Sequence, residues 1–439
     1  MGNTKRYWSG LEELKETNDY KTTLENEFPE EQTVDAFLAD EKLKDVNTGR
    51  RDFLKFMGFS ITAATLAACE TPVVKSIPYV NKPEEITPGV ANYYASTYYD
   101  GNDYANVLVK TREGRPIFIK PNRALGASGE LNPRINSSVL GLYDAARVEG
   151  PTKGGQAIDW ASADDEIMKA LAAAQNPVIL SNTVLSPSKQ RAIDMFKAKY
   201  NAGHVQYDSI SYSGLREAHK AAMGKAIIPS FHFDKAKVVV SIAADFQGSW
   251  LQSNVFSADF AKTRVPEGEW MSKHFQFESN LSLSGTNADV RTMIKPSQEG
   301  KVAAALYEII TGAGAGSVEG INNNAVAAAA QMLKASRGEG IVVAGSNDPN
   351  IQMIVVEINK ALGNYGATIN ADRPINLFQG NDANFAGFVA SMNKGAVDFI
   401  LIDGVNPYYS YIDGAAFDAG LAKVKTSVAT SLYADETAS

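Results

Sequence analysis

The stretch "NPVILSNTVLSPSKQRAIDMFKAKY", residues 176–200, contains two different patterns within 25 positions. Residues 177–181 form a short apolar run of the kind found in buried strands. Residues 187–200 follow a Ser-Pro pair and carry apolar side chains at helical spacing. A buried strand that leads through a short loop into an amphipathic helix is the repeating unit of a parallel sheet covered on both faces. The stretch therefore predicts an α/β fold.

The same alternation recurs in the second half of the chain. The stretches that repeat it are "KAKVVVSIAADF" at 235–246, "EGIVVAGSN" at 339–347 with "PNIQMIVVEINKALG" at 349–363, and "AVDFILIDG" at 396–404 with "AFDAGLAKV" at 416–424. We expect two doubly wound α/β units with parallel sheets, one over residues 151–300 and one over residues 301–439. Before them, "ANVLVKTREGRPIFIKPN" (105–122) has alternating runs on both sides of Arg-Glu-Gly-Arg, which predicts a β-hairpin in a β-rich region over residues 93–150.

The segment "GRRDFLKFMGFSITAATLAAC", residues 49–69, has the features of an export signal. Its weakly apolar part, residues 56–68, is shorter than the roughly 20 residues that a membrane-spanning helix needs. Arg50 and Arg51, followed by Phe53, Leu54 and Lys55, are similar to a twin-arginine signal, which predicts an export leader over residues 1–68. The alternative is an amphipathic surface helix with a chance arginine pair.

Cys69 is the single cysteine of the chain and closes the sequence Leu-Ala-Ala-Cys, which resembles a lipobox. We expect leader cleavage before Cys69 and acylation of its thiol, since two or three acyl chains anchor a protein stably. Four prolines between residues 70 and 92 predict an extended tether over residues 69–92.

Charge and residue usage exclude several classes of function. Residues 1–68 hold 9 of the 42 Lys and Arg and 13 of the 50 Asp and Glu, so the rest of the chain carries a formal charge of −4. Without a dense basic patch, nucleic acid is not an expected partner. With its one thiol acylated, the chain has no thiolate for an iron–sulfur cluster, a cysteine–zinc site or covalent haem attachment.

The remaining polar residues give no catalytic constellation. The four histidines, none of them spaced i, i+4 as a ligand pair, are His204, His219, His232 and His274. We expect His232 at a strand edge. Asp164, Asp165 and Glu166 fall in the first turn of a helix expected to begin at an N-cap Ser162, where the helix dipole explains them. We therefore predict no catalytic, cofactor-binding or metal-binding residue.

Several phrases along the chain resemble landmarks of the molybdopterin oxidoreductase superfamily, in the order in which that family has them. They are "EGRPIFIKPN", "NPRIN", "LGLYDAARVEGP", "IDWASADDEI", "ADVRTMIKPSQEGKVAAALYEII", "GVNP" and "TSLYADETA". The leader preceded by "YWSGLEEL", together with "AADFQGSW" at 243–250, is similar to the iron–sulfur and molybdopterin-like B subunit of alternative complex III, a membrane assembly that oxidises quinol.

The sequence also departs from the superfamily pattern. Active members have cluster-binding cysteines around the hairpin, whereas residues 93–106 and 123–138 here have none. Ala244, Asp245 and Phe246 stand where the family often has Asn-Pro, which argues against binding of the pterin dinucleotide. The family pattern also continues past "ADETAS", so we expect this sequence to be the first part of a longer polypeptide whose remainder bears the iron–sulfur clusters.

Taken together, the resemblance and the departures imply a non-catalytic structural module of a quinol-oxidising complex, lipid-anchored at the periplasmic face of the bacterial inner membrane. They imply no cofactor in this chain, haem c in a multihaem cytochrome partner, and integral membrane subunits that oxidise quinol. Two alternatives stay open: a fragment of a true molybdopterin-binding oxidoreductase, and a periplasmic solute-binding lipoprotein. Three tyrosines, Tyr408, Tyr409 and Tyr411, are candidates for a contact surface, with packing inside the fold as the alternative role.

Overall fold

The computed structural model describes residue 87 and residues 89–438. The export signal and Cys69 lie outside the described residues, so those predictions stay predictions. Everything below concerns the unit Lys82–Ser439. No helix among the described residues is long and apolar enough to cross a membrane.

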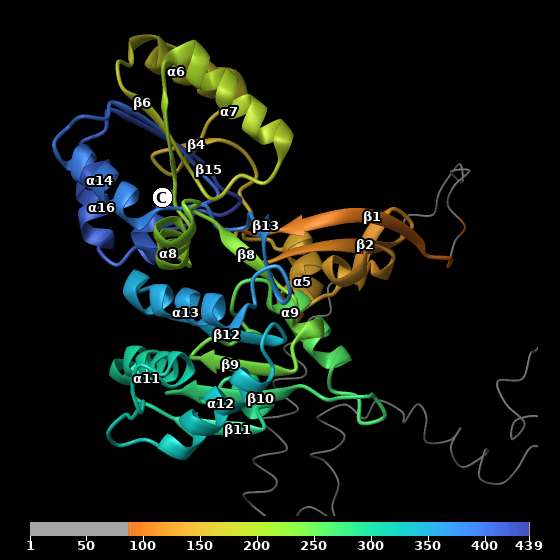
Figure 1. Cartoon of the computed structure of the whole chain (residues 1–439). Helices are drawn as coiled ribbons and strands as arrows, with labels where there is room; N and C mark the ends of the chain where they lie inside the picture. The colour runs from red at the N-terminus through yellow and green to blue at the C-terminus, as the bar shows by residue number, and fades with distance from the viewer. Residues whose placement is uncertain (1–86, 88, 439) are drawn as a thin grey trace, which may run out of the picture. The chain divides into compact units, whose positions relative to one another are not determined.

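The described part begins with a three-stranded antiparallel sheet (Figure 1). Its strands are β1 (Asn92–Tyr99), β2 (Tyr104–Arg112) and β3 (Arg115–Pro121), paired in the order β1-β2-β3. The predicted hairpin is β2–β3. It turns at Glu113 and Gly114, which both have positive φ, as a two-residue turn matched to the strand twist requires.

One face of this sheet is buried by two short helices. The covering helices are α5 (Pro133–Ser137) and the 3₁₀ helix η3 (Ser138–Tyr143), preceded by the 3₁₀ segment η2 (Arg123–Gly129). Ala105 and Val107 of β2 pack there against Ile135 and Val139. The side chain of Asn132 caps α5 by accepting a hydrogen bond from the Ile135 amide, and a proline at the first helical position fixes its start.

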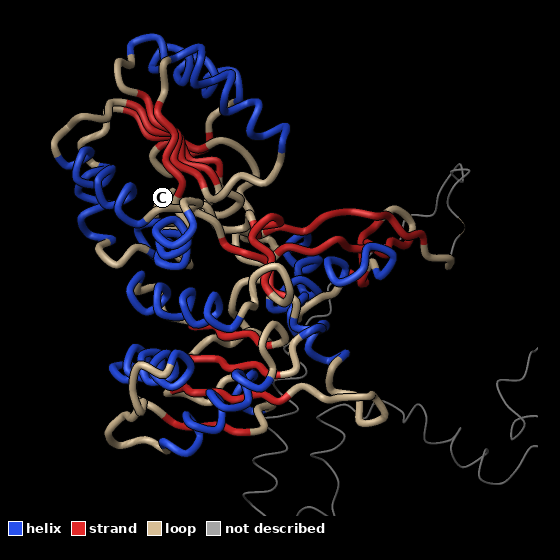
Figure 2. The backbone as a smooth tube through the Cα atoms, in the orientation of Figure 1, coloured by secondary structure: helices blue, strands red, loops and turns tan. Residues whose placement is uncertain are grey.

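Two four-stranded parallel sheets form the α/β body (Figure 2). Sheet I has the order β15-β14-β6-β7, with β6 (Pro177–Ser181), β7 (Gly203–Gln206), β14 (Phe399–Asp403) and β15 (Thr426–Thr430). Sheet II has the order β11-β10-β9-β12, with β9 (Val238–Ile242), β10 (Lys273–Glu278), β11 (Val290–Met293) and β12 (Gly340–Ala344). These parallel sheets confirm the predicted α/β class.

The two α/β units are interleaved in the chain and do not follow each other as expected. Strands β9 and β12 lie on either side of residue 300, yet they pair in register from Val238 with Gly340 to Ile242 with Ala344. Sheet I likewise joins β6 and β7 to β14 and β15, which come about 200 residues later. Hydrophobic periodicity identifies each strand but carries no information about its neighbour, so the expected division at residue 300 does not match the sheets.

Helices cover both faces of each sheet. Sheet I is covered by α6 (Trp160–Ala173) and α7 (Pro187–Tyr200) on one face, and on the other by α14 (Asp382–Asn393) and α16 (Gly414–Leu421) (Figure 1). Sheet II packs one face on α11 (Glu299–Thr311), α12 (Asn323–Ala335) and α13 (Pro349–Leu362), and the other against α8 (Ser213–Met223) and α9 (Ser253–Lys262).

Short elements complete the described part of the chain. The two-stranded pairs are β4 (Thr152–Lys153) with β5 (Gln156–Ala157), and β8 (Ile228–Phe231) with β13 (Ile369–Ile375). The short helices are η4 (Phe233–Lys235), α10 (Leu283–Thr286), η5 (Pro296–Gln298) and α15 (Pro407–Ser410). His232 follows β8 and is half-buried, which agrees with its predicted place at a strand end.

Candidate functional site

Open parallel sheets bind ligands outside the carboxyl ends of their strands, where neighbouring connections leave in opposite directions. Sheet I has this point between β6 and β14, and sheet II has it between β9 and β12. These two carboxyl edges are therefore where a bound group would be expected. The chain's own loops and side chains occupy both.

At the edge of sheet I, a buried carboxylate holds a segment from far along the chain. Asp208, two residues after β7, accepts hydrogen bonds from the Thr183 amide at 2.9 Å and the Thr183 hydroxyl at 2.8 Å. It also accepts from the amide of Gly380 at 2.8 Å. The Thr183 hydroxyl accepts in turn from the Gln379 amide at 2.6 Å. Residues 376–381 are thereby fixed across the carboxyl ends of β6 and β7.

Two further contacts hold the same segment from the other side. The guanidinium of Arg216 on α8 donates to the carbonyls of Gln379 and Gly380, at 2.5 and 3.1 Å. Tyr99, at the end of β1, donates to the carbonyl of Leu377 at 3.4 Å. Burial raises the pKa of Asp208, although the hydrogen bonds from Gly380 and Thr183 act in the opposite direction.

The edge of sheet II is closed by direct backbone approach. A Cβ on Gly345, just after β12, would lie 2.3 Å from the carbonyl oxygen of Ala243, just after β9. The two loops therefore touch where a ligand would have to enter. Ala243 itself has a φ of +56°, an uncommon conformation for a residue with a side chain. A Cβ on Gly214, at the start of α8, would likewise lie 2.0 Å from the Asn347 carbonyl oxygen.

The residues that replace the family's Asn-Pro are part of this closure. Asp245 accepts hydrogen bonds from the amide and the hydroxyl of Ser284, at 2.9 and 2.8 Å. Phe246 is fully buried and stacks on Phe233, with ring centroids 4.4 Å apart. The carboxylate and the aromatic ring at these positions are both engaged within the protein.

A row of buried polar side chains, which the sequence analysis did not predict, runs along β10. His274, Gln276 and Glu278 alternate along the strand and are each at most 2% exposed. The imidazole Nε2 lies 3.0 Å from the Gln276 carbonyl oxygen, and the Gln276 amide donates to Glu278 at 3.1 Å. Arg291 forms a 2.6 Å ion pair with Glu278. The signal that could have revealed the row is its alternation with Phe275 and Phe277.

The two ends of this row have different protonation states: His274 is neutral and Glu278 is ionised. Burial lowers the pKa of His274 to about 4, which keeps the imidazole neutral. Burial alone would raise the pKa of Glu278, but hydrogen bonds from Ser282 and Arg291 outweigh it and leave that pKa lowered. The row therefore carries one negative charge, paired with Arg291. Glu278 does not face an open cleft: a Cβ on Gly285 would lie 1.8 Å from its carboxylate.

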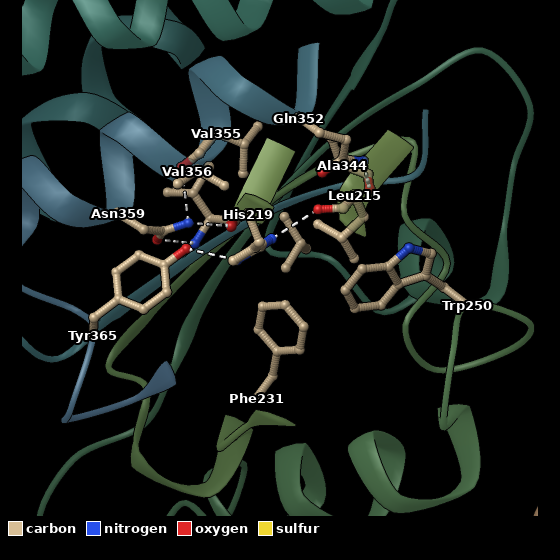
Figure 3. A pocket seen from close by; sticks show the side chains of 12 residues that line it. Leu215, His219, Phe231, Trp250, Ala344, Gln352, Val355, Val356, Asn359 and Tyr365 are labelled. Carbon is tan, nitrogen blue, oxygen red and sulfur yellow. Dashed lines mark hydrogen bonds between the residues drawn. The ribbon is translucent and has the colours of Figure 1, made fainter. Parts of the chain in front are cut away.

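Two cavities lie beside these edges, and each is about 10 Å³, which is room for about one water molecule. The first lies between α8, β12 and α13, and Figure 3 shows its lining. His219 Nδ1 lies 2.8 Å from the Leu215 carbonyl, so it carries the hydrogen and Nε2 accepts from the Tyr365 hydroxyl at 3.0 Å. Burial lowers the pKa of His219. The second cavity lies at the carboxyl end of β7, between Asp208 and Phe385.

One expectation about the acidic residues of α6 is wrong. The N-cap is Asp159, whose carboxylate accepts from the Ser162 amide at 2.9 Å, and the helix begins at Trp160. Asp164 and Asp165 consequently lie in the second turn, where the dipole effect has weakened. Asp and Ser cap equally well, so the sequence alone did not decide between the two positions.

The other candidate residues are scattered over the fold. No group of three or more His, Cys, Asp or Glu side chains within residues 89–438 could hold a metal ion. His204 lies beside Ser181 on sheet I, whereas His219 bonds to Tyr365 and His274 packs against Phe246 near sheet II. Tyr411 packs edge-on against Phe385, with centroids 4.9 Å apart, while Tyr409 is 77% exposed.

Comparison with known proteins agrees with this architecture. No protein-family model matches the chain. The chain is 24% identical over 450 residues to the menaquinone reductase, molybdopterin-binding-like subunit, of Nitratidesulfovibrio vulgaris, a match that covers 89% of this chain. Acetylene hydratase from Pelobacter acetylenicus superposes with a TM-score of 0.56 and 10% identity, over 79% of this chain. The fold is of the molybdopterin oxidoreductase type. The chain spans 64% of the length of the first protein and 60% of the second.

The carboxyl edges do not fit the pterin cofactor that this type of fold implies. Cofactor pockets have volumes of about 300–1,000 Å³, whereas the cavity at the carboxyl end of β7 holds about one water. The polar groups that would face such a cofactor already bond to one another. Thr183 bonds to Asp208, and Ser284 bonds to Asp245. Asp208 also bonds to Gly380 in the 376–381 segment. We therefore derive no chemical step through a pterin.

Proposed function

We propose that this chain is a non-catalytic structural module of a membrane-attached electron-transfer complex that oxidises quinol, of the alternative complex III type. The match to a molybdopterin-binding-like subunit of a menaquinone reductase supports a role as one subunit of a multi-subunit quinone-linked complex. The assignment to alternative complex III depends on the leader, "AADFQGSW" and the other sequence phrases quoted above.

The observation that carries the proposal is the closure of both carboxyl edges by the chain itself. Asp208 and Gly380 fix the 376–381 segment over sheet I, and Gly345 meets Ala243 over sheet II. When the chain itself fills the carboxyl edges where ligands would bind, the outer surface of the fold remains available for contacts with partner proteins. In the proposed role this chain binds no redox cofactor of its own.

The remaining parts of the proposal follow from the sequence. Cys69 carries the lipid, and Arg50 and Arg51 direct export, so that the module is anchored at the periplasmic face of the inner membrane. Its partners are a multihaem cytochrome c and integral membrane subunits that oxidise quinol, with no nucleic acid among them. The iron–sulfur clusters belong to a further part of the same subunit.

One contact surface is proposed on the loop around α15. Tyr409 is 77% exposed and Ile412 is 99% exposed, so two large apolar side chains face solvent close together in the sequence. Aromatic residues are enriched in the buried cores of protein interfaces. Tyr411 is excluded from this surface because it packs inside, against Phe385.

A second candidate function is that of a molybdopterin-binding oxidoreductase fragment, which the match to a molybdopterin-binding-like subunit favours. It would require residues 376–381 to leave the edge of sheet I and break the bonds to Asp208 and Thr183. A solute-binding lipoprotein, the third possibility from the sequence, would need an open cleft between α/β units, and the cavities at the two edges do not provide one.

The experiment replaces the subunit in a host that makes the complex, and follows assembly on a native gel and quinol oxidation in membranes. Deletion of residues 93–438 should abolish assembly. The double variant Tyr409→Asp with Ile412→Asp should reduce recovery of the complex at least tenfold. Its control is Met195→Asp, since Met195 is also exposed, at 65%, but lies on α7. Normal assembly and quinol oxidation after the deletion would contradict the proposal.

A further inference from the structure

The hairpin β2–β3 carries a concentration of positive charge that the rest of the chain lacks. The segment "KTREGRPIFIKPNR", residues 110–123, contains five Lys or Arg and one carboxylate, Glu113. The chain as a whole has a formal charge of −8. A segment of net positive charge in an acidic protein attracts anionic partners.

The charge lies at the free end of the three-stranded sheet. The opposite end is attached to the α/β body, because Tyr99 donates hydrogen bonds to the carbonyls of Thr183 and Leu377, at 3.1 and 3.4 Å. Strand β2 has nine residues and rises about 3.4 Å for each. The β2–β3 turn is therefore separated from the attached end by roughly 27 Å, and Figure 1 shows the sheet extending away from the body.

Apolar and aromatic side chains accompany the cations at this end. Ile117 and Phe118 are each 43% exposed. Phe118 pairs with Lys110, and Lys110 pairs with Tyr93, so these three side chains share one face of the sheet. The ammonium group of Lys120 lies 5.1 Å from the centre of the Tyr93 ring. Cations interleaved with aromatic and aliphatic groups are typical of surfaces that lie on a bilayer interface.

The described chain enters the sheet at this same end. Strand β1 begins there, since Asn92 pairs with Thr111 next to the turn. A Cβ on Gly89 would lie 3.5 Å from the Arg112 guanidinium. The 23 residues that separate Cys69 from Asn92 span at most about 80 Å when extended, so an acyl chain on Cys69 would hold this end of the sheet near the membrane.

We propose that the basic tip, defined as Lys110, Arg112, Arg115, Ile117 and Phe118, docks on a membrane surface of anionic phospholipid. The cations contact lipid headgroups, and the two apolar side chains enter the interface between headgroups and acyl chains. This inference rests on the proposed function. Docking of the tip would hold the anchored module with one face toward the bilayer. The charge and geometry of the tip do not depend on lipidation, so the docking can be tested without the lipid.

The experiment uses the purified full-length chain with Cys69→Ser, which removes acylation. Its binding to vesicles of phosphatidylcholine, with and without about one-third phosphatidylglycerol, is measured by flotation. The tip variant combines Lys110→Gln, Arg112→Gln and Arg115→Gln. Its control neutralises three exposed cations on other elements, with Arg191→Gln, Lys301→Gln and Lys394→Gln. The leader is present in every protein compared, so its contribution cancels.

The parental chain should bind the anionic vesicles, weakly bind those of phosphatidylcholine alone, and dissociate as salt is raised. Each cation near an anionic surface contributes about fivefold in affinity, so the tip variant should bind on the order of a hundredfold more weakly. The control should change less than about threefold. Equal binding of the parental chain to both vesicle types would overturn the inference. So would an equal loss of vesicle affinity in the tip variant and the control. A third contrary result is a tip variant that fails to assemble while the parental chain binds no vesicles. Unchanged circular dichroism verifies that the variants are folded.

Discussion

The amide of Gly380 donates a 2.8 Å hydrogen bond to the carboxylate of Asp208, which lies 172 positions earlier in the chain. Asp208 is 6% exposed and lies two residues after β7, while Gly380 belongs to the segment that precedes α14. The bond therefore joins two distant parts of the sequence at the edge of sheet I. Open parallel sheets bind ligands at this kind of edge, so the bond lies where a ligand would otherwise be expected.

Replacement of Asp208 by Asn should destabilise the protein by about 1–3 kcal/mol, because the amide group presents a donor where the native carboxylate accepts. Urea-induced unfolding measures the change. Asp372→Asn is the matched control, since the Asp372 side chain is 92% exposed, and it should change the free energy of unfolding by less than about 0.5 kcal/mol. Equal stability of the two variants would show that the contact between Asp208 and Gly380 does not hold the segment.

The closure of sheet II gives a second prediction, from a pair of glycines. Gly345→Ala should destabilise by about 2–3 kcal/mol, because the added methyl group would lie 2.3 Å from the Ala243 carbonyl oxygen. Gly387→Ala on α14 meets no atom within 4 Å and should be neutral or stabilising by up to about 1 kcal/mol. Thermal unfolding of both proteins gives the comparison. A Gly345→Ala protein as stable as the parent would mean that the two loops can separate.

Acidification should weaken the fold through His274. Its pKa falls from 6.5 to about 4 on burial, so between these values the unfolded chain binds a proton that the folded chain excludes. Stability contributed by this residue is complete above pH 6.5 and is lost as the pH falls toward 4, by about 3 kcal/mol in all. His274→Gln should reduce the slope of unfolding free energy against pH in this window. An unchanged slope would place the acid sensitivity elsewhere, for example at His219, whose pKa is also lowered.

Lipidation of Cys69 is tested by mass spectrometry of the N-terminal peptide from membranes. The twin-arginine and Leu-Ala-Ala-Cys signals together predict a cleaved chain that begins with an acylated cysteine. Cys69→Ser should leave the protein uncleaved or free of the membrane fraction. Recovery of most parental molecules with residues 1–68 intact would refute this prediction.

The sequence was sufficient to predict individual elements wherever burial imposes a simple pattern. "KAKVVVSIAADF" predicts β9 because every residue of Val238–Ile242 is buried, and the Arg-Glu-Gly-Arg turn predicts the hairpin β2–β3. It was insufficient where several residues satisfy the same local rule, as for Asp159 and Ser162 at the start of α6.

The closed edges could not be predicted from the sequence because they depend on tertiary contacts. Nothing near Asp208 indicates that Gly380 will reach it, and nothing near Gly345 indicates that Ala243 lies against it. The spacing of apolar residues indicates where strands and helices lie. Which strands and loops contact one another depends on packing over the whole fold. The absence of cluster-binding cysteines around the hairpin was visible in the sequence, but the contacts that fill the carboxyl edges of the two sheets were not.

The most direct test of the central claim is the molybdenum, tungsten and pterin content of the complex purified from its native membranes. Hydrogen bonds hold Gln379 and Gly380 to Thr183 and Asp208 across the edge of sheet I, and in the proposed role these contacts take up the site that a cofactor would need. We therefore predict less than about 0.1 equivalent of either metal and of pterin per chain, in preparations that oxidise quinol at full rate. About one equivalent of metal together with one or two of pterin would contradict the account, because the edge would then have to open and carry a cofactor.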